Sequence, residues 1–509
     1  MKKTAVYILL LLILLTGAGP LLGQIPSVGV DDFVTPPDPH WAGITSSDVE
    51  AAYRFLLDNH PGAAPSLHDA KFMQRLTAAR DAAMQRAHTV SSYQGYIFTL
   101  AAFATSMGDK HIWSRPIFNV AYPRWTGMIV SKRGAAFVVT DTDESHAHWQ
   151  GAELLSCDGI AAGELARKNL GGFRADWSVG AQEIQAAPWL LVDEQNPFIP
   201  RPTTCTFKAG SVQHAVKLDW QRIKREALLP RLKAAIGAGA AGFGVRSVGH
   251  GTWIALQDLS APETQGVVQA VESQKQALRN AAFVVVDVRG NGGGSSEVAR
   301  EIEESLMGRD FVVSRLGVES QSNCGGADGA WRTSAGNIAD MEYLLTTVLS
   351  GGSEARRIFS EVLRDAKAAR ARGEDFSASI HCPVAPRPVV SNPPISALRG
   401  KLFLLTDNLC FSSCLALTDS FRELGATQIG QTTDAATHFT EVRETYLPSG
   451  YSLFSTLQSV VDAGGPVQVG PFQPSIEYTG DIADTAKLEQ WVIRLALQAQ
   501  TSSGTEGAK

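Results

Sequence analysis

This sequence of 509 residues lacks the usual signals for nucleic-acid, metal or cofactor binding. Its formal net charge is −6, so no surplus of Lys and Arg is available for a phosphate backbone, and we exclude nucleic acid as a partner. No Cys-x-x-Cys or His-x-x-x-His spacing occurs, and we expect neither a metal site nor a cofactor. What remains is a chain with 44% hydrophobic residues, enough for two or three globular domains.

Long apolar runs are also missing, except at the N-terminus. The chain begins MKKTAVYILLLLILLTGAGPLLGQ, in which two lysines precede an apolar run over residues 5–15 and small residues follow. This pattern is typical of a secretory signal peptide, here residues 1–23, with an uncleaved anchor as the alternative. We therefore expect a secreted or periplasmic protein that keeps no membrane span once the signal is removed.

Export changes the meaning of the cysteines, because disulfides form in oxidising compartments. Six cysteines allow 15 connectivities, and the sequence alone does not choose among them. Proximity along the chain suggests three pairs: Cys157 with Cys205, Cys324 with Cys382, and Cys410 with Cys414.

Periodicity predicts a multidomain α+β protein. Residues 24–118 are helical in pattern, including SSDVEAAYRFLLDN, which is expected to begin with a serine cap. Residues 119–225 contain short alternating strands and are predicted to form a mostly β domain. Residues 226–498 alternate apolar strands with helices, which predicts a mostly parallel sheet with an insertion at 316–396. A tail follows at 499–509.

A glycine cluster follows one of these buried strands, in VVVDVRGNGGGSS at residues 284–296. Glycines at the end of a strand expose backbone N–H groups, which suits an oxyanion cradle, although a tight strand-to-helix turn is the simpler alternative. The Lys-Ser/Thr ending of a phosphate loop and the Gly-x-Gly-x-x-Gly spacing are both absent.

Two serines stand between two cysteines in LTDNLCFSSCLALTDSFRELGAT, residues 405–427. Apolar residues at helical spacing predict a helix that begins near Ser412 or Ser413 and ends at Gly425. A serine there is either a nucleophile or a helix N-cap. The cysteines are nucleophiles or, in an exported protein, a disulfide.

A serine nucleophile needs a base. Two of the eleven histidines are candidates: His111 in SMGDKHIW, where helical and β regions meet, and His438 in TTDAATHFTE. A single histidine is more often structural, and that alternative stays open for both.

In combination these segments resemble the C-terminal processing (tail-specific) serine proteases and their tricorn-like relatives. FVVVDVRGNGGG is similar to the Asp-Leu-Arg-x-Asn-x-Gly-Gly element of the family, GAELLSCDGIAAGEL to the turn of a PDZ-like domain, and MGDKHIW to the family's Asp-x-His segment. The resemblance implies a PDZ-like domain and a ClpP/crotonase-like α/β domain. It also implies Ser412 as nucleophile, the backbone N–H groups of Gly293 and Ser413 as oxyanion donors, and a polypeptide substrate.

The base separates two branches of the family. Tail-specific members use a lysine after the serine, but the corresponding region here reads TTDAATHF and contains none. Tricorn-like members use the histidine of Asp-x-His, which implies His111 as base, with His438 as the alternative. Glu441, Glu444 and Glu477 are the candidates for the acid that orients this base.

Two departures from the family pattern keep other functions open. Leu415 replaces the usual acidic residue soon after the serine, and Ser475 follows Pro474 where the family has aspartate. An inactive peptide- or lipid-binding protein on the same fold is therefore the main alternative. An esterase or amidase is a weaker one, because Ser412 lacks the Gly-x-Ser-x-Gly elbow.

Overall fold

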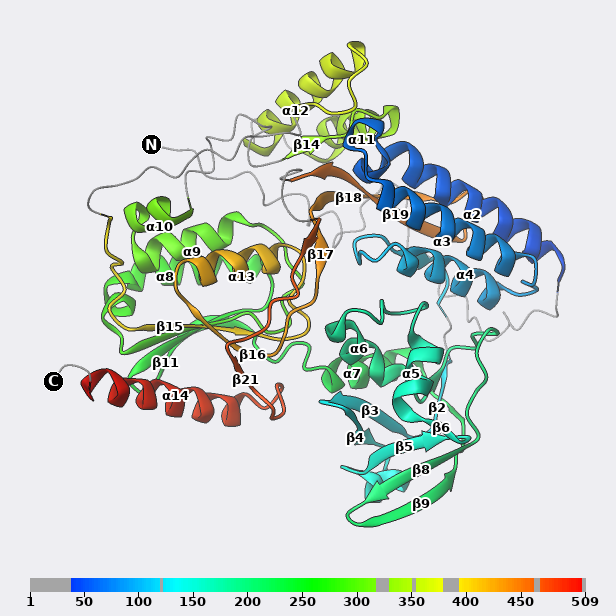
Figure 1. The fold of residues 1–509 in the computed structure, drawn as a ribbon, viewed down its shortest axis with the longest axis horizontal. Helices are drawn as coiled ribbons and strands as arrows, with labels where there is room; N and C mark the ends of the chain where they lie inside the picture. Colours follow the sequence, from blue (N-terminus) through cyan, green and yellow to red (C-terminus); the bar gives the residue numbers. More distant parts are fainter. Residues whose placement is uncertain are drawn as a thin grey trace.

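The computed structural model describes residues 38–119, 122–316, 329–349, 354–378, 393–461 and 467–505. The predicted signal peptide, Cys324 and Cys382 lie outside these ranges, so these predictions stay untested. No helix within the described ranges is long and apolar enough to cross a bilayer. The expected mixture of helices and sheets is confirmed, and Figure 1 shows how these elements are arranged along the chain.

Three helices form the N-terminal part: α2 (His40–Asn59), α3 (Ala70–Ala87) and α4 (Tyr93–Ser106). The expected serine cap of the first helix is wrong, because α2 already begins at His40, and the Ser46 hydroxyl donates to the Ala42 carbonyl inside the helix. The other two helices have side-chain caps, since Asp69 and Ser92 each accept from a backbone N–H three residues later.

These helices share their core with strands from much later in the chain. A sheet of β1, β18, β19 and β14 lies beside them, and Leu447 and Phe454 are buried in the helical core. The bounds are Ser114–Pro116 for β1, Phe439–Tyr446 for β18, Ser452–Val460 for β19 and Ala330–Trp331 for β14. The β14 strand leads into α11 (Ala335–Tyr343) and α12 (Glu354–Ala371), which belong to the predicted insertion.

The middle of the chain forms an antiparallel sheet of β3, β4, β5, β6, β8 and β9. Cys157 and Cys205 are direct partners on β5 (Glu153–Cys157) and β8 (Thr204–Ala209), and their predicted disulfide is confirmed. The other bounds are Met128–Arg133 for β3, Ala136–Thr142 for β4, Ile160–Ala161 for β6 and Val212–Lys217 for β9. Helices α5 (Ala162–Leu170) and α6 (Gly180–Ala186) belong to this part.

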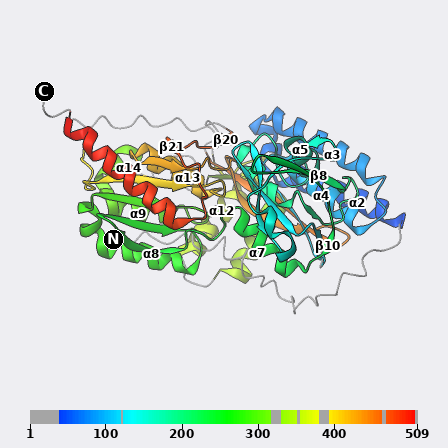
Figure 2. The same ribbon diagram turned by 90° about the horizontal axis from the view of Figure 1, so that it is seen from below.

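A sheet in the order β11-β12-β13-β15-β16-β21 forms the centre of the α/β part. All neighbours are parallel except β11 and β12. Helices α8, α9, α10 and α13 cover one face and α14 the other, as Figures 1 and 2 show. The strands are β11 (Phe243–Val248), β12 (Gly251–Leu256), β13 (Phe283–Asp287), β15 (Lys401–Thr406), β16 (Thr427–Gly430) and β21 (Ile476–Glu477). The helices are α8 (Pro262–Asn280), α9 (Glu297–Met307), α10 (Arg309–Leu316), α13 (Ser413–Glu423) and α14 (Thr485–Thr505).

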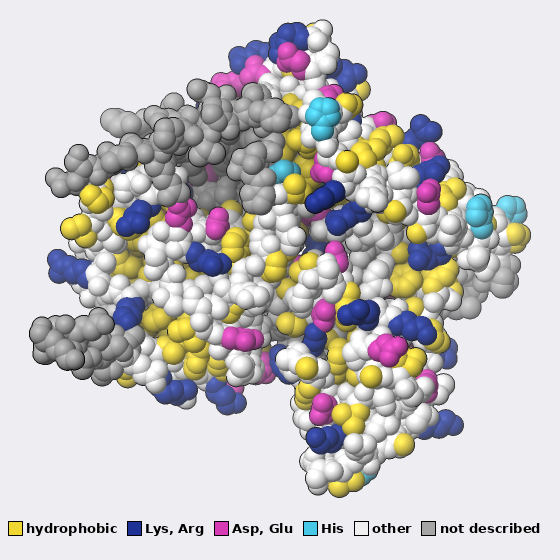
Figure 3. All heavy atoms as spheres, viewed as in Figure 1, with side chains coloured by type: hydrophobic (Ala, Val, Ile, Leu, Met, Phe, Trp, Pro, Cys, Tyr) yellow, Lys and Arg dark blue, Asp and Glu magenta, His cyan; other side chains and the backbone are white. Residues whose placement is uncertain are grey.

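The surface in view carries Lys and Arg side chains interspersed with Asp and Glu (Figure 3). No single-sign patch dominates this face, which agrees with the small net charge of the sequence.

Candidate active site

Two loops meet at the carboxyl ends of the neighbouring parallel strands β13 and β15. We call residues 288–296 the glycine loop and residues 407–412 the serine turn. Ligand sites in parallel sheets gather at this edge, because the loops after adjacent strands lie side by side. Two hydrogen bonds join the loops: Gly290 N to Asp407 Oδ2 (2.9 Å) and Phe411 N to the Asn291 carbonyl (3.1 Å). A third, from Ser413 Oγ to the Gly294 carbonyl (2.6 Å), joins the start of α13 to the glycine loop.

Ser412 is held in an unusual backbone conformation at the end of the serine turn. Its φ is 56° and its ψ is −128°, a region that residues with a side chain rarely adopt. Strain of this kind occurs at functional sites, as in the strand-to-helix elbow of α/β-hydrolases. Ser412 occupies the N-cap position of α13, but its side chain makes no capping bond to the helix.

Gly293 lies directly against Ser412. A Cβ at this position would be 2.7 Å from Ser412 Cβ and 3.0 Å from Ser413 N, so the close approach of the two loops requires glycine. The Gly293 N–H, the predicted oxyanion donor, here donates to Asn291 Oδ1 at 2.9 Å. The Ser413 N–H, at the first position of α13, makes no hydrogen bond to any described residue.

The serine turn is closed by the predicted disulfide between Cys410 and Cys414, which is confirmed. Both cysteines are buried, so neither is a free nucleophile. Gly425 ends α13 as predicted: its φ is 96°, and the N–H groups of Gly425 and Ala426 donate to the carbonyls of Arg422 and Phe421. The disulfide therefore fixes the start of the short α13 helix, and Gly425 terminates its other end.

His111 lies beside the serine turn and is oriented by Asp109. The Asp109 Oδ1 atom is 2.8 Å from His111 Nδ1 and also accepts from the His111 backbone N–H, while Thr437 donates to Oδ2. The His111 ring packs on Phe411, with 4.4 Å between ring centroids. Burial alone would raise the pKa of Asp109, but its charge and hydrogen-bond contacts with His111 and the bond from Thr437 outweigh burial and lower that pKa.

Ser412 and His111 are near neighbours without a direct bond. Among the described residues, no hydrogen bond joins Ser412 Oγ to His111, whose ring Nδ1 faces Asp109. His438 is buried, its ring packs on Phe439 at 4.5 Å, and its backbone N–H donates to the Val467 carbonyl. The contact with Phe411 places His111 next to the serine turn.

The acid that orients His111 comes from a different place than the sequence analysis expected. Glu444 pairs with Arg115 at 3.0 Å, Glu477 is exposed on β21, and Glu441 lies on β18 with a φ of 64°. The orienting carboxylate is that of Asp109, two residues before His111. The Asp-x-His spacing itself was the signal that identifies it.

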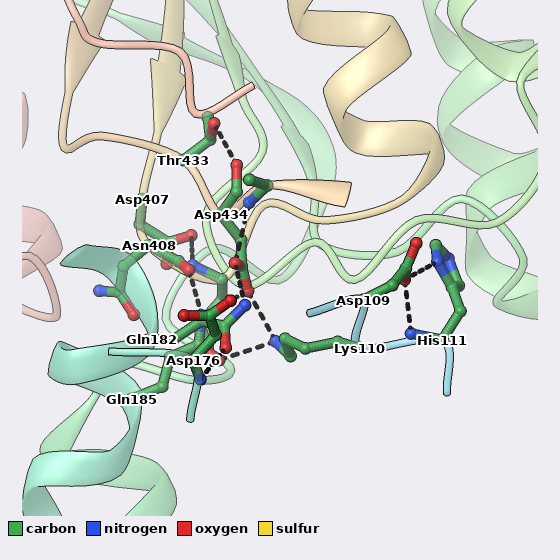
Figure 4. A network of polar contacts seen from close by, with 12 residues as sticks. Asp109, Lys110, His111, Asp176, Gln182, Gln185, Asp407, Asn408, Thr433 and Asp434 are labelled. Atoms are coloured by element: carbon green, nitrogen blue, oxygen red, sulfur yellow. Dashed lines mark hydrogen bonds and ion pairs between the residues drawn. The ribbon is translucent and has the colours of Figure 1, made fainter. Parts of the chain in front are cut away.

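A second polar network surrounds Lys110 and was missed in the sequence (Figure 4). Lys110 Nζ lies 2.7 Å from Oδ2 of Asp434, a fully buried carboxylate, and 4.8 Å from the centre of the Phe411 ring. Gln182 and Gln185 of α6 also donate to Asp434, at 3.1 and 2.9 Å. The segment that carries His111 is therefore tied to the α/β part and, through α6, to the middle of the chain.

Comparison with known proteins agrees with this geometry. Residues 252–477 match the profile of peptidase family S41. Mature CPAF complexed with lactacystin has a TM-score of 0.59 at 14% identity, covering 90% of this chain and 100% of that one; a second structure of mature CPAF scores 0.57 at 15% identity, covering 90% and 98%.

A photosystem II D1 C-terminal processing protease has a TM-score of 0.35 at 12% identity over 88% of this chain and 96% of that one, a score too low to support an inference. No curated protein matches the sequence. At these identities the CPAF structures establish the similarity of fold alone.

Proposed function

Because residues 252–477 match the profile of peptidase family S41, we propose that this chain is an exported serine endopeptidase of the tail-specific and tricorn-like kind, with Ser412 as nucleophile. One observation carries the proposal. Ser412 has a strained backbone and a side chain that makes no capping bond, and it lies beside a histidine that a buried carboxylate orients. Such a nucleophile, base and orienting acid form the arrangement that serine hydrolases share.

The histidine geometry supports a definite proton path. Asp109 faces His111 Nδ1, so that nitrogen carries the proton and Nε2 is left to accept. His111 Nε2 takes the Ser412 hydroxyl proton while Ser412 Oγ attacks the scissile carbonyl carbon, and then returns that proton to the leaving amine. The acyl-enzyme is released by water, activated in the same way. Hydrogen bonds between base and nucleophile are often long without substrate, so His111 closes on Ser412 when the peptide binds.

The tetrahedral oxyanion needs backbone donors. The Ser413 N–H is suited to this role, because it lies at the N-terminus of α13, where the helix dipole favours negative charge. The Gly293 N–H joins it only after releasing Asn291 Oδ1, its present partner.

The remaining parts support recognition of exported polypeptides. We assign the antiparallel sheet and α5 as a PDZ-like domain that adds an extended peptide end as a strand. The N-terminal apolar run and two disulfides support action outside the cytoplasm.

The direct test is labelling with a biotinylated fluorophosphonate, followed by mass spectrometry of the modified peptide. We expect the label on Ser412, its loss in Ser412→Ala, and its retention in Ser413→Ala, which keeps the backbone N–H and loses only the bond to Gly294. Labelling of Ser413, or none in the folded protein, would contradict the proposal.

An inactive binding protein on the same fold is the second candidate. The missing bond between Ser412 and His111 favours it, as do Leu415 and Ser475. It predicts that unstructured polypeptides bind but are not cut, and that Ser412→Ala leaves binding unchanged. Cleavage of an unfolded protein substrate by the wild type, absent in Ser412→Ala, would exclude this candidate.

A further inference from the structure

A large open cavity lies behind the orienting carboxylate of Asp109. Its volume is about 360 Å³, and all three major parts of the chain contribute to its walls. Asp109 and Thr437, which hold His111 in place, both line it. The cavity therefore begins one side chain away from the proposed base.

The walls are largely apolar. Phe72, Met107, Ile112, Val179 and Phe439 line the cavity, and all five are buried. Five charged residues also line it: the cations Lys71 and Arg75 and the carboxylates Asp69, Asp109 and Asp176. The buried apolar residues suit an apolar ligand group. The two cations and three carboxylates nearly cancel, so the lining does not favour an anionic one.

One wall carries a polar group with an unused donor. His60 is 1% exposed, stacks on Phe72 at 4.2 Å between centroids, and meets the edge of the Phe439 ring at 4.7 Å. Its Nδ1 accepts from the Gly62 N–H at 3.0 Å, so in the neutral ring the proton sits on Nε2.

That Nε2–H is buried and has no acceptor among the described residues. Buried donors are nearly always paired, so an orphaned one in a cavity wall indicates a group that arrives with a ligand. Burial also lowers the pKa of His60 to about 3, which keeps the ring neutral and its Nε2 a donor over the physiological range.

We infer that this cavity is a substrate subsite, which takes an apolar side chain of the bound polypeptide while His60 Nε2 donates to a main-chain carbonyl of that polypeptide. This inference rests on the proposed function for the identity of the ligand. The apolar walls select the side chain, the unpaired donor selects a peptide group, and Asp109 connects the cavity to the base.

The experiment measures binding separately from cleavage. The probe is a short fluorescein-labelled Gly/Ser peptide with one central Phe, and its control carries Ala at that position. Fluorescence anisotropy measures the affinity of each peptide for the full chain carrying Ser412→Ala, which cannot cleave it. We expect the Phe probe to bind at least about tenfold more tightly than the Ala probe.

Variants of the cavity locate the site. Val467 lines the cavity and is 49% exposed, so Val467→Trp should fill the opening and reduce the Phe probe to the affinity of the Ala probe. His60→Asn keeps an acceptor for Gly62 but removes the inner donor, and should weaken binding about tenfold, as expected for one hydrogen bond. His60→Gln restores a donor near the Nε2 position and should recover most of that loss.

Equal affinity for the two probes, or full binding by folded Val467→Trp, would overturn the inference. Displacement of the probe by a fatty acid that itself binds more tightly than any peptide would also overturn it, in favour of a lipid site. If a His60 variant does not fold, Val467→Trp decides. The two hypotheses can also fail separately. If the protein binds the Phe probe more tightly than the Ala probe but neither cleaves peptides nor reacts with the fluorophosphonate, the subsite inference stands and the proposed peptidase function is refuted.

Discussion

The backbone strain at Ser412 predicts an unusual pair of stability changes. A residue with a side chain at φ 56° and ψ −128° costs about 1–3 kcal/mol, whereas glycine adopts this region freely. Replacement by glycine also adds about 0.5–1 kcal/mol of conformational entropy to the unfolded chain. The balance favours glycine, so Ser412→Gly should be more stable than Ser412→Ala by about 1 kcal/mol. Both variants lack the hydroxyl, so this difference isolates the backbone.

Urea unfolding followed by far-UV circular dichroism measures the effect, with the two variants compared at the same slope. Ser413 provides the matched control, because it is the first residue of α13 and both substitutions there remove the same bond to Gly294. At that position glycine should be less stable than alanine by about 0.5–1 kcal/mol. If Ser412→Gly is equal to or less stable than Ser412→Ala, the turn stores no strain and the elbow interpretation is wrong.

Three further predictions concern the surroundings of the turn. Asp434→Asn removes the buried partner of Lys110; we expect a loss of about 2–4 kcal/mol in unfolding free energy and a larger fall in kcat than rise in KM, because the segment bearing the base loosens. An unchanged kcat would show that the network is only structural. Replacing Cys410 and Cys414 together by serine should cost about 2 kcal/mol, the loop-closure entropy of so short a loop, and equal denaturation midpoints would refute this. Burial raises the pKa of Asp407 to about 7, so the folded state keeps a proton that the unfolded chain releases near its ordinary value of 3.8. Unfolding free energy should therefore fall between about pH 4 and pH 7, by up to about 4 kcal/mol, with this component absent in Asp407→Asn; parallel pH profiles would contradict it.

The features of the candidate site that depend on neighbouring residues could be predicted from the sequence. The serine turn, the start and end of α13 and the Cys410–Cys414 bond all depend on residues within a few positions of one another, and these predictions are confirmed. The role of Asp109 was within reach, because it precedes His111 by two residues. The expected acids, Glu441, Glu444 and Glu477, all lie much farther along the chain.

The occupied N–H of Gly293 could not be foreseen in the same way. Whether a backbone donor is free depends on where the Asn291 side chain turns, and the alternatives differ only in local geometry. The glycine itself was predicted, and its physical reason is the 2.7 Å that a Cβ would leave to Ser412 Cβ.

The sequence by itself determined the elements that short-range physics controls: the apolar strands, the helices, the cap at Gly425 and the proximity of the two cysteines of the turn. Only the tertiary structure decided which distant residues meet. Thr437 reaches Asp109, Asp434 reaches Lys110, and β19 packs under the N-terminal helices, each across more than three hundred residues of chain. Such contacts depend on how whole layers pack, because burial is favourable for many pairings and only the complete core selects one. The cavity beside Asp109 follows from the same packing, since no single segment of the sequence encloses it.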